Sequence, residues 1–165
     1  MKFTNWLANV LENKEQRVKK QWELCEKYDS SVLSLTINIP GAKKQSSDAK
    51  FIFNEAVKEI ENFGLKTYEK ISTCRDTGYE ALWSLHVEPL ALKKLTCRVE
   101  ESHPLGRFMD IDVLDKDKKI LSRKTQRRCY LCSQSAKVCA RSQKHSIEEL
   151  LTFISKKVDD YRTSL

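Results

Sequence analysis

Apolar residues recur at two different spacings along the chain. Between residues 3 and 29 they recur three and four positions apart, among many Lys and Glu. This spacing predicts one long helix or two short ones, with a solvated outer face. In "SVLSLTINI" (31–39), Leu33, Leu35 and Ile37 instead alternate with smaller or polar residues. Alternation predicts a strand with one apolar face, which Pro40-Gly41 ends.

The remaining elements follow from the same two periods. A second helix is predicted to begin at Ser47 or Asp48 and to stop at Gly64. Strands are predicted at 65–72 and 81–88, on either side of a turn at 75–80. Pro89 then opens a single helical turn, and 95–102 alternates like a strand. Residues 103–115 form the next strand, and "DKDKK" is a hairpin turn into "ILSR".

A last helix begins with an S-x-x-E capping box at Ser146 and Glu149. Strands interleaved with helices predict an α+β fold with a mixed β-sheet flanked by helices. We expect a single domain, residues 1–165. It contains an N-terminal helical segment (1–29), an α+β core with the candidate catalytic residues (31–128), and a Cys/His cluster with the C-terminal helix (129–165).

Composition narrows the class of protein. The 165 residues are 40% hydrophobic and 32% charged, which excludes a disordered chain. No run approaches a transmembrane helix, and the N-terminus lacks a signal-peptide cleavage site, so we expect a cytoplasmic protein. The formal charge of +7 favours anionic partners, although solubility alone explains such an excess equally well.

Six cysteines in a chain without a signal peptide argue against a disulfide scaffold. Cys25, Cys74 and Cys97 lie in patterned segments and are expected to be buried thiols. The other three cysteines lie close to a histidine near the C-terminus and form a separate candidate site.

Two aspartates stand one residue apart in the apolar run "HPLGRFMDIDVLD" (103–115). Side chains two apart on a strand project to the same face, about 6.5–7 Å apart at their Cα atoms. Asp110 and Asp112 therefore repel each other and need a counter-charge. Mg²⁺ prefers carboxylate oxygens and often binds substrate phosphates as well, so the pair predicts a metal site for phosphoryl or nucleotidyl transfer. Two solvated aspartates are the simpler alternative.

Residues near the aspartate pair favour a phosphate ligand. Gly106 permits a close backbone approach, and Arg107 can bind a phosphate through two donors. Three further arginines, Arg123, Arg127 and Arg128, follow soon after and could reach a polyphosphate. A third carboxylate would complete a two-metal site; Asp115 and Asp117 are expected in a turn, which leaves Glu100.

Cys129, Cys132, Cys139 and His145 provide the ligand types of a structural zinc site. Their spacing, C-x2-C, C-x6-C and then five residues to the histidine, is more compact than in most zinc fingers. Reduced cysteines packed as small apolar groups are the alternative.

Several blocks of the sequence resemble one family. "SHPLGRFMDIDVLD", "LSR" and "RRCYLCSQSAKVCARSQKHS" resemble the citrate lyase holo-acyl-carrier-protein synthase family, also called apo-citrate lyase phosphoribosyl-dephospho-CoA transferase. "IPGAKKQS", "IFNEAV" and "TGYEAL" resemble further blocks of it. The resemblance spans roughly residues 31 to 154.

The resemblance implies transfer of triphosphoribosyl-dephospho-CoA to a serine of the acyl carrier subunit of citrate lyase, with release of pyrophosphate. It further implies a nucleotidyltransferase-like fold, with Mg²⁺ held by Asp110 and Asp112. Gly106 and Arg107 would contact the triphosphate, and His103 would shape the same pocket. Lys44 and Ser46 would bind phosphate or the CoA part.

Two other functions compete with this one. A small basic zinc-knuckle protein that binds nucleic acid would use the same charge and the same Cys/His cluster. It would leave the paired aspartates unexplained, because carboxylates repel phosphate. A related synthase acting on another carrier, such as that of malonate decarboxylase, would use the same chemistry.

Overall fold

The structure is a computed structural model that describes residues 2–123 and 125–165. These residues form, in chain order, α1 (Lys2–Tyr28), β1 (Ser31–Ile37), α2 (Ser47–Glu61), β2 (Thr67–Arg75), β3 (Gly78–Leu85), α3 (Pro89–Ser102), the short 3₁₀ helix η1 (Gly106–Phe108), β4 (Met109–Leu114), α4 (Ala136–Ser142) and α5 (Ile147–Ser164). The predicted α+β class is confirmed.

The four strands form one sheet in the order β2-β3-β1-β4, and every pairing in it is antiparallel. The predicted mixed sheet is therefore wrong. Helix α2 joins β1 to β2, which run in the same direction, but β3 lies between them. Helix α3 likewise joins β3 to β4, and β1 lies between those two. The sequence therefore forms a split β-α-β-β-α-β arrangement in which parallel strands are never neighbours.

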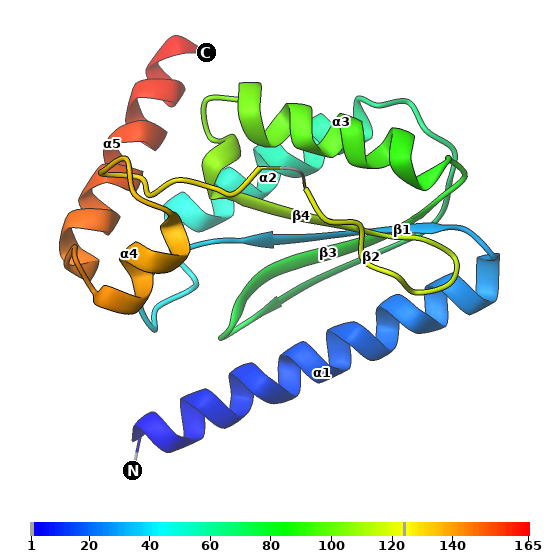
Figure 1. The fold of residues 1–165 in the computed structure, drawn as a ribbon, viewed down its shortest axis with the longest axis horizontal. Helices are drawn as coiled ribbons and strands as arrows, with labels where there is room; N and C mark the ends of the chain where they lie inside the picture. The colour runs from blue at the N-terminus through cyan, green and yellow to red at the C-terminus, as the bar shows by residue number, and fades with distance from the viewer. Residues whose placement is uncertain (1, 124) are drawn as a thin grey trace.

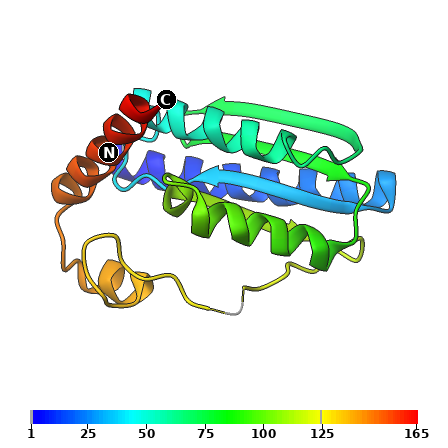
Figure 2. The same cartoon turned by 90° about the horizontal axis from the view of Figure 1, so that it is seen from above.

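Helices cover both faces of the sheet (Figure 1). Helices α2 and α3 lie on one face, over the main core of Leu33, Leu35, Trp83 and Ile111. Helix α1 runs along the other face, where Leu24 and Cys25 pack against Val32, Leu82 and Leu114. Both sides of β1 are thus buried, whereas the alternation predicted one apolar face. Seen from above, α4 and α5 stand together at one end of the sheet (Figure 2).

Helix α3 replaces the predicted helical turn and strand at 89–102. Its buried residues are Leu92, Lys93, Thr96, Val99 and Glu100, which recur at helical spacing. Two of these five are charged, so apolar residues alone show the period poorly. Pro89 at the first turn and the side chain of Glu88, which accepts from Ala91 N at 2.7 Å, fix the start of the helix.

Smaller differences concern single positions. Ser46, not Ser47 or Asp48, caps α2, because its side chain accepts from Ala49 N. The capping box at Ser146 and Glu149 is present as predicted. The turn at 115–119 also forms, but "ILSR" contributes a single bridge, between Leu114 and Ile120, rather than a strand.

The three cysteines outside the C-terminal cluster differ in exposure. Cys25 is buried as predicted, whereas Cys97 is only partly buried and Cys74 is exposed. Cys74 lies on β2, which forms an edge of the sheet, so alternation along that strand does not imply burial. Among the described residues, no helix is long and apolar enough to cross a membrane.

Candidate active site

The two aspartates of β4 project from the same face of the sheet, as the alternation predicted. Met109, Ile111 and Val113 are fully buried on the opposite face, over the main core. Asp110 is exposed and Asp112 is partly buried. Register places Asp110 opposite Thr36 and Asp112 opposite Ser34 of β1, so hydroxyl side chains flank both carboxylates.

The position of Asp112 next to Asp110 disfavours the ionised form of the Asp112 carboxyl. Burial raises the pKa of Asp112, and the negative charge of Asp110 raises it further. Lys93, Arg17 and Arg127 act in the opposite direction, but the pKa remains raised. The surrounding cations therefore do not fully compensate the carboxylates. Two oxygen ligands with uncompensated negative charge suit a hard divalent cation such as Mg²⁺.

A third carboxylate lies on the same face, on β3. Glu80 is opposite Thr36, which is also the partner of Asp110, so Asp110 and Glu80 lie two strands apart. Their backbones are thus separated by roughly 9–10 Å. Asn13 donates to Glu80 at 2.8 Å, and Arg17 of α1 forms an ion pair with it.

Sequence reasoning missed Glu80 because it assigned residues 75–80 to a turn. Strand β3 begins at Gly78, so the turn is shorter and Glu80 belongs to the strand. The signal that could have found it is its alternation with Ala81, Trp83 and Leu85, which face the main core.

A pocket of about 580 Å³ lies beside the start of β4 and the end of β1. Lys44, Arg107 and Arg127 line it, together with Tyr130. Arg127 also reaches to 3.7 Å from Asp110, so the pocket adjoins the aspartate pair. Burial lowers the pKa of Lys44, whose ammonium group donates to Ile39 O. The Arg107 guanidinium lies over the Tyr130 ring, 5.5 Å from its centroid.

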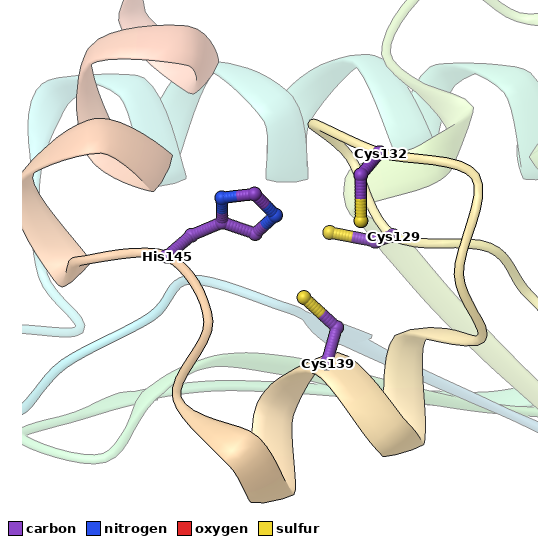
Figure 3. Close-up of side chains that lie close together, drawn as sticks. All are labelled: Cys129, Cys132, Cys139 and His145. Carbon is purple, nitrogen blue, oxygen red and sulfur yellow. The ribbon is translucent and has the colours of Figure 1, made fainter.

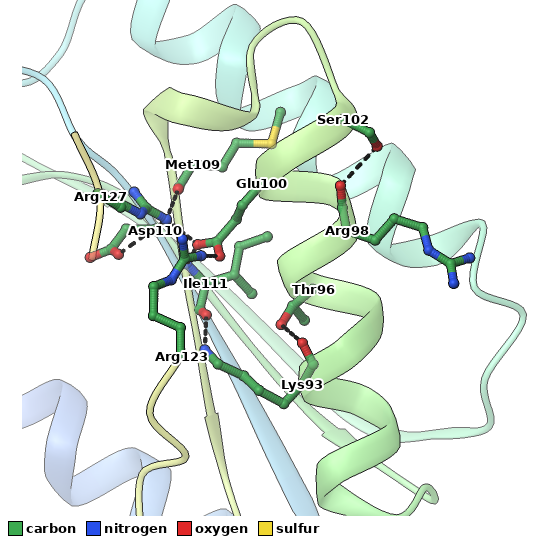
Figure 4. Close-up of polar contacts among 10 residues, drawn as sticks. All are labelled: Lys93, Thr96, Arg98, Glu100, Ser102, Met109, Asp110, Ile111, Arg123 and Arg127. Carbon is green, nitrogen blue, oxygen red and sulfur yellow. Dashed lines mark hydrogen bonds and ion pairs between the residues drawn. The ribbon is translucent and has the colours of Figure 1, made fainter. Parts of the chain in front are cut away.

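Glu100, the carboxylate that the sequence suggested as a third metal ligand, has other partners (Figure 4). Its buried side chain accepts from Ile111 N at 2.9 Å and pairs with Arg123 and Arg127. Arg127 also donates to Met109 O at 2.8 Å. Arg123 is therefore engaged with Glu100 at the edge of β4, whereas Arg127 links Glu100 to Asp110 and the pocket.

The other predicted substrate-binding residues lie outside the pocket lining. Ser46 caps α2, and the exposed Arg128 takes part through its backbone carbonyl, which accepts from Arg107. His103 ends α3, where its ring lies 5.1 Å from that of Tyr161 and accepts from Leu105 N at 3.0 Å. Their roles in binding stay predictions.

Gly106 is needed for packing in this structure. A Cβ at position 106 would lie 2.4 Å from Val99 O and 2.7 Å from Glu100 O of α3. The glycine therefore lets η1 pass directly against the end of α3 and delivers the chain into β4. The close approach in the structure is made to backbone carbonyls of α3, and the predicted approach of a phosphate to Gly106 stays a prediction.

The four C-terminal zinc-ligand candidates come together in space. The ligand atoms of Cys129, Cys132, Cys139 and His145 all lie within 4.8 Å of one another. Cys129, Cys139 and His145 also line the 580 Å³ pocket, on the side opposite the sheet. The Cys/His cluster therefore borders the pocket directly, whereas the aspartate pair is connected to it through Arg127, which lies 3.7 Å from Asp110.

Comparison with known proteins identifies the family. Residues 6–161 match the family described as apo-citrate lyase phosphoribosyl-dephospho-CoA transferase. A Vibrio cholerae serotype O1 protein named "probable apo-citrate lyase phosphoribosyl-dephospho-CoA transferase" is 36% identical, with 94% of this chain and 92% of that protein covered. Apo-citrate lyase phosphoribosyl-dephospho-CoA transferases of Shigella boydii serotype 18 and Escherichia coli are each 33% identical, with 93% of this chain and 88% of theirs covered. The chain therefore belongs to the apo-citrate lyase phosphoribosyl-dephospho-CoA transferase family.

Proposed function

We propose that this protein transfers triphosphoribosyl-dephospho-CoA to a serine of the apo acyl carrier subunit of citrate lyase. The serine oxygen forms a bond to phosphorus as the bond to pyrophosphate breaks, and the hydroxyl proton is released. One observation carries the proposal: in a chain of this family, two carboxylates share a strand face beside a cationic pocket. The reaction is nucleotidyl transfer in chemical type.

Asp110 and Asp112 are the residues that would hold Mg²⁺, and the donor set fits because both offer carboxylate oxygens from one face. When bound, the ion would neutralise the charge of the polyphosphate during transfer. Glu80 is a third candidate ligand, provided that Arg17 releases it. The proposed similarity to nucleotidyltransferases depends on this paired-carboxylate arrangement rather than on strand order.

The chain's own side chains would position the nucleotide. Arg107 and Lys44 provide positive charge within the pocket, where partial burial strengthens their attraction for phosphate. Arg127 bridges the pocket and Asp110, so it can orient the phosphates toward the carboxylates. The nucleophile comes from the carrier, so the protein's contribution is positioning and charge stabilisation.

The alternative of a nucleic-acid-binding zinc knuckle is not favoured. The sheet face that carries Asp110 and Glu80 presents carboxylates, which repel a phosphate backbone. Family membership also supports the transferase. The relatives reported above carry citrate lyase in their names, which favours that carrier over the one of malonate decarboxylase.

A transfer assay tests the proposal directly. The protein, the apo acyl carrier subunit, triphosphoribosyl-dephospho-CoA and Mg²⁺ are mixed, and the carrier is weighed by mass spectrometry. We expect the carrier to gain, at a single serine, the mass of triphosphoribosyl-dephospho-CoA minus that of the released pyrophosphate. The gain should vanish with EDTA and fall by at least about 10³-fold in rate with Asp110→Asn or Asp112→Asn.

Asp117→Asn is the matched control for these two variants. It removes the same charge from an exposed turn seven residues beyond Asp110. Asp117 contributes its backbone N–H to this turn, by donating to Asp115 Oδ1, rather than its side chain. Its transfer rate should equal that of the unmodified protein. A carrier that gains no mass with the unmodified protein, or full activity in Asp110→Asn, would overturn the proposal.

A further inference from the structure

We propose that Cys129, Cys132, Cys139 and His145 bind one structural zinc ion, and that this ion holds the outer wall of the substrate pocket in place. The description of that pocket as the nucleotide site rests on the proposed function; the zinc site does not. Figure 3 shows the three sulfurs and the imidazole ring facing a common centre.

The geometry matches a four-coordinate site. All four ligand atoms lie within 4.8 Å of one another. Zinc–sulfur bonds of about 2.3 Å in a tetrahedron place neighbouring sulfurs about 3.8 Å apart. The observed separations therefore need to shorten by no more than about 1 Å, a shift that side-chain rotation can supply. Four protein ligands leave no open position, which is the arrangement of structural sites.

His145 provides an independent observation. Its Nε2 atom is buried and has no hydrogen-bond partner among the described residues. A buried ring nitrogen without a partner is unfavourable unless a ligand satisfies it, and a zinc ion would do so. Three thiols cannot all pair with one another as disulfides, whereas three thiolates and one imidazole complete a zinc site.

The backbone around Cys129 and Cys132 forms a closed loop. Leu131 N donates to Cys129 Sγ at 3.5 Å, a contact that would stabilise a thiolate ligand. Cys129 N donates to Gln134 O at 2.8 Å, and a bridge joins Arg128 to Ser135, so the loop between Cys129 and Cys132 is closed at its base.

This part of the chain lacks an apolar core of its own. Within 120–146, residue 124 aside, Cys139 is the one fully buried residue. Helix α4 is only seven residues long, so its own hydrogen bonds do not make it stable. Metal ligation supplies folding free energy to such segments in place of hydrophobic burial. We infer that zinc fixes residues 129–145 against α5 and the end of the sheet.

The same residues face the proposed nucleotide site. Cys129, Cys139 and His145 line the pocket opposite Arg107 and Lys44, and Tyr130, next to Cys129, lies under the Arg107 guanidinium. Loss of the ion would release this wall and the Tyr130 ring with it. The metal would therefore support nucleotide binding without contacting the reacting phosphates.

Metal analysis tests the zinc site without reference to activity. We expect the purified full-length protein to carry about one zinc per chain, and Cys132→Ser to lose most of it. Replacing zinc with Co²⁺ should give the intense visible absorption of a tetrahedral ion and a thiolate-to-cobalt charge-transfer band. Cys74→Ser, which alters an exposed cysteine outside the cluster, should leave zinc content unchanged. Fully folded, metal-free protein, or cobalt bound without thiolate bands, would overturn the site.

Binding of triphosphoribosyl-dephospho-CoA tests the second part of the inference. Cys132→Ser should bind it about tenfold or more weakly, the equivalent of one lost charge-assisted contact. Cys132→His, which restores a zinc ligand, should recover both zinc and binding even if Cys132→Ser folds poorly. Asp110→Asn should keep its zinc while losing transfer, so the two proposals fail separately. Unchanged nucleotide affinity in folded, zinc-free protein would overturn the role of the ion in the pocket.

Discussion

At the scale of single residues, Asp112 is a residue whose ionised form is unfavourable for folding but suited to binding a cation. Its carboxylate lies on the face covered by α1, next to Asp110 and close to Arg17, Lys93 and Arg127. Burial and the neighbouring charge both raise its pKa, so the folded chain holds the ionised form less readily than the unfolded chain does. A residue that is unfavourable in the absence of a ligand is typical of a binding site.

The raised pKa makes a prediction about stability without metal. Between the unfolded pKa of Asp, about 3.9, and the folded pKa, the folded chain binds more protons at Asp112 than the unfolded chain. The contribution of Asp112 to the free energy of unfolding therefore falls as pH rises through this window and stays low above it. We expect metal-free Asp112→Asn to be more stable than the unmodified protein at pH 7, and equally stable below about pH 3.5, in urea unfolding measurements.

Added Mg²⁺ should reverse the order of the two proteins at pH 7. At a hundred times its dissociation constant, an ion that binds only the folded chain adds about 2.7 kcal/mol to the free energy of unfolding. The unmodified protein should gain this amount and Asp112→Asn should not. An Asp112→Asn protein that is less stable at pH 7 without metal would mean that Arg17 and Arg127 already compensate the charge.

Some positions in the candidate site could be predicted from the sequence, and others depend on how the strands and helices pack. The shared direction of Asp110 and Asp112 follows from the two-residue period of a strand, which is local and needs no tertiary information. The position of Glu80 depends on the pairing of β3 with β1, which no local pattern encodes. Gly106 could be recognised as a point of close approach, but not that α3 is what it approaches.

At the scale of elements, β4 is an edge strand whose free backbone groups are covered by side chains rather than by another strand. Glu100 accepts from Ile111 N, Lys93 donates to Ile111 O at 3.1 Å, and Arg127 donates to Met109 O. These contacts block edge-to-edge association and fix β4 in register with β1. They also place Arg127 between the strand edge and the pocket (Figure 4).

Glu100→Gln should destabilise the fold substantially. The amide keeps the size of the side chain, but it leaves the partly buried Arg123 without its carboxylate and Arg127 with only Asp110, at 3.7 Å. Removing one partner of a buried ion pair costs about 3 kcal/mol or more. Glu101→Gln, the exposed neighbour on α3, should change the free energy of unfolding by less than about 0.5 kcal/mol. Equal urea midpoints for the two variants would mean that the arginines find other partners.

These contacts at the edge of β4 also explain why the sequence predicted a helical turn and a strand where α3 lies. The helix buries Lys93 and Glu100 because they serve the edge of β4, so its buried face is partly charged. Patterns based on hydrophobicity assign charged residues to the solvent side and leave a false two-residue alternation in 95–102. Helix α5, whose buried residues Ile154 and Val158 are apolar, was predicted correctly from the same chain.

At the scale of the whole molecule, the pocket forms where three parts of the chain meet at one end of the sheet. The loop after β1 contributes Lys44, the 3₁₀ helix η1 contributes Arg107, and the Cys/His segment forms another wall. These parts are up to about a hundred residues apart in sequence, so the composition of the pocket follows from the topology. The segments that resemble the family contain these parts, but the sequence alone does not show that the parts lie side by side.

In the proposed function, the net charge of +7 would act on the approach of an anionic substrate, whereas the pocket would act on its bound state. Long-range attraction is screened at high salt, because the Debye length falls from about 10 Å at 0.1 M to about 3 Å at 1 M. Contacts within a half-buried pocket are screened less. Arg107 is suited to such a contact, since it forms no ion pair with a carboxylate among the described residues and its guanidinium lies over Tyr130.

Arg107→Ala and Arg128→Ala should therefore separate the two effects. Both remove one positive charge, but Arg107 lines the pocket and Arg128 is exposed outside the lining. We expect Arg107→Ala to weaken triphosphoribosyl-dephospho-CoA binding by roughly 10- to 150-fold at low and at high salt, because a charge-assisted contact of about 1.5–3 kcal/mol is lost. Arg128→Ala should weaken binding by only a few-fold, and only at low salt, in calorimetric titrations. If both variants lost affinity equally and only at low salt, the protein would attract the nucleotide by net charge alone, and the Arg107 side chain would have no specific part in holding it.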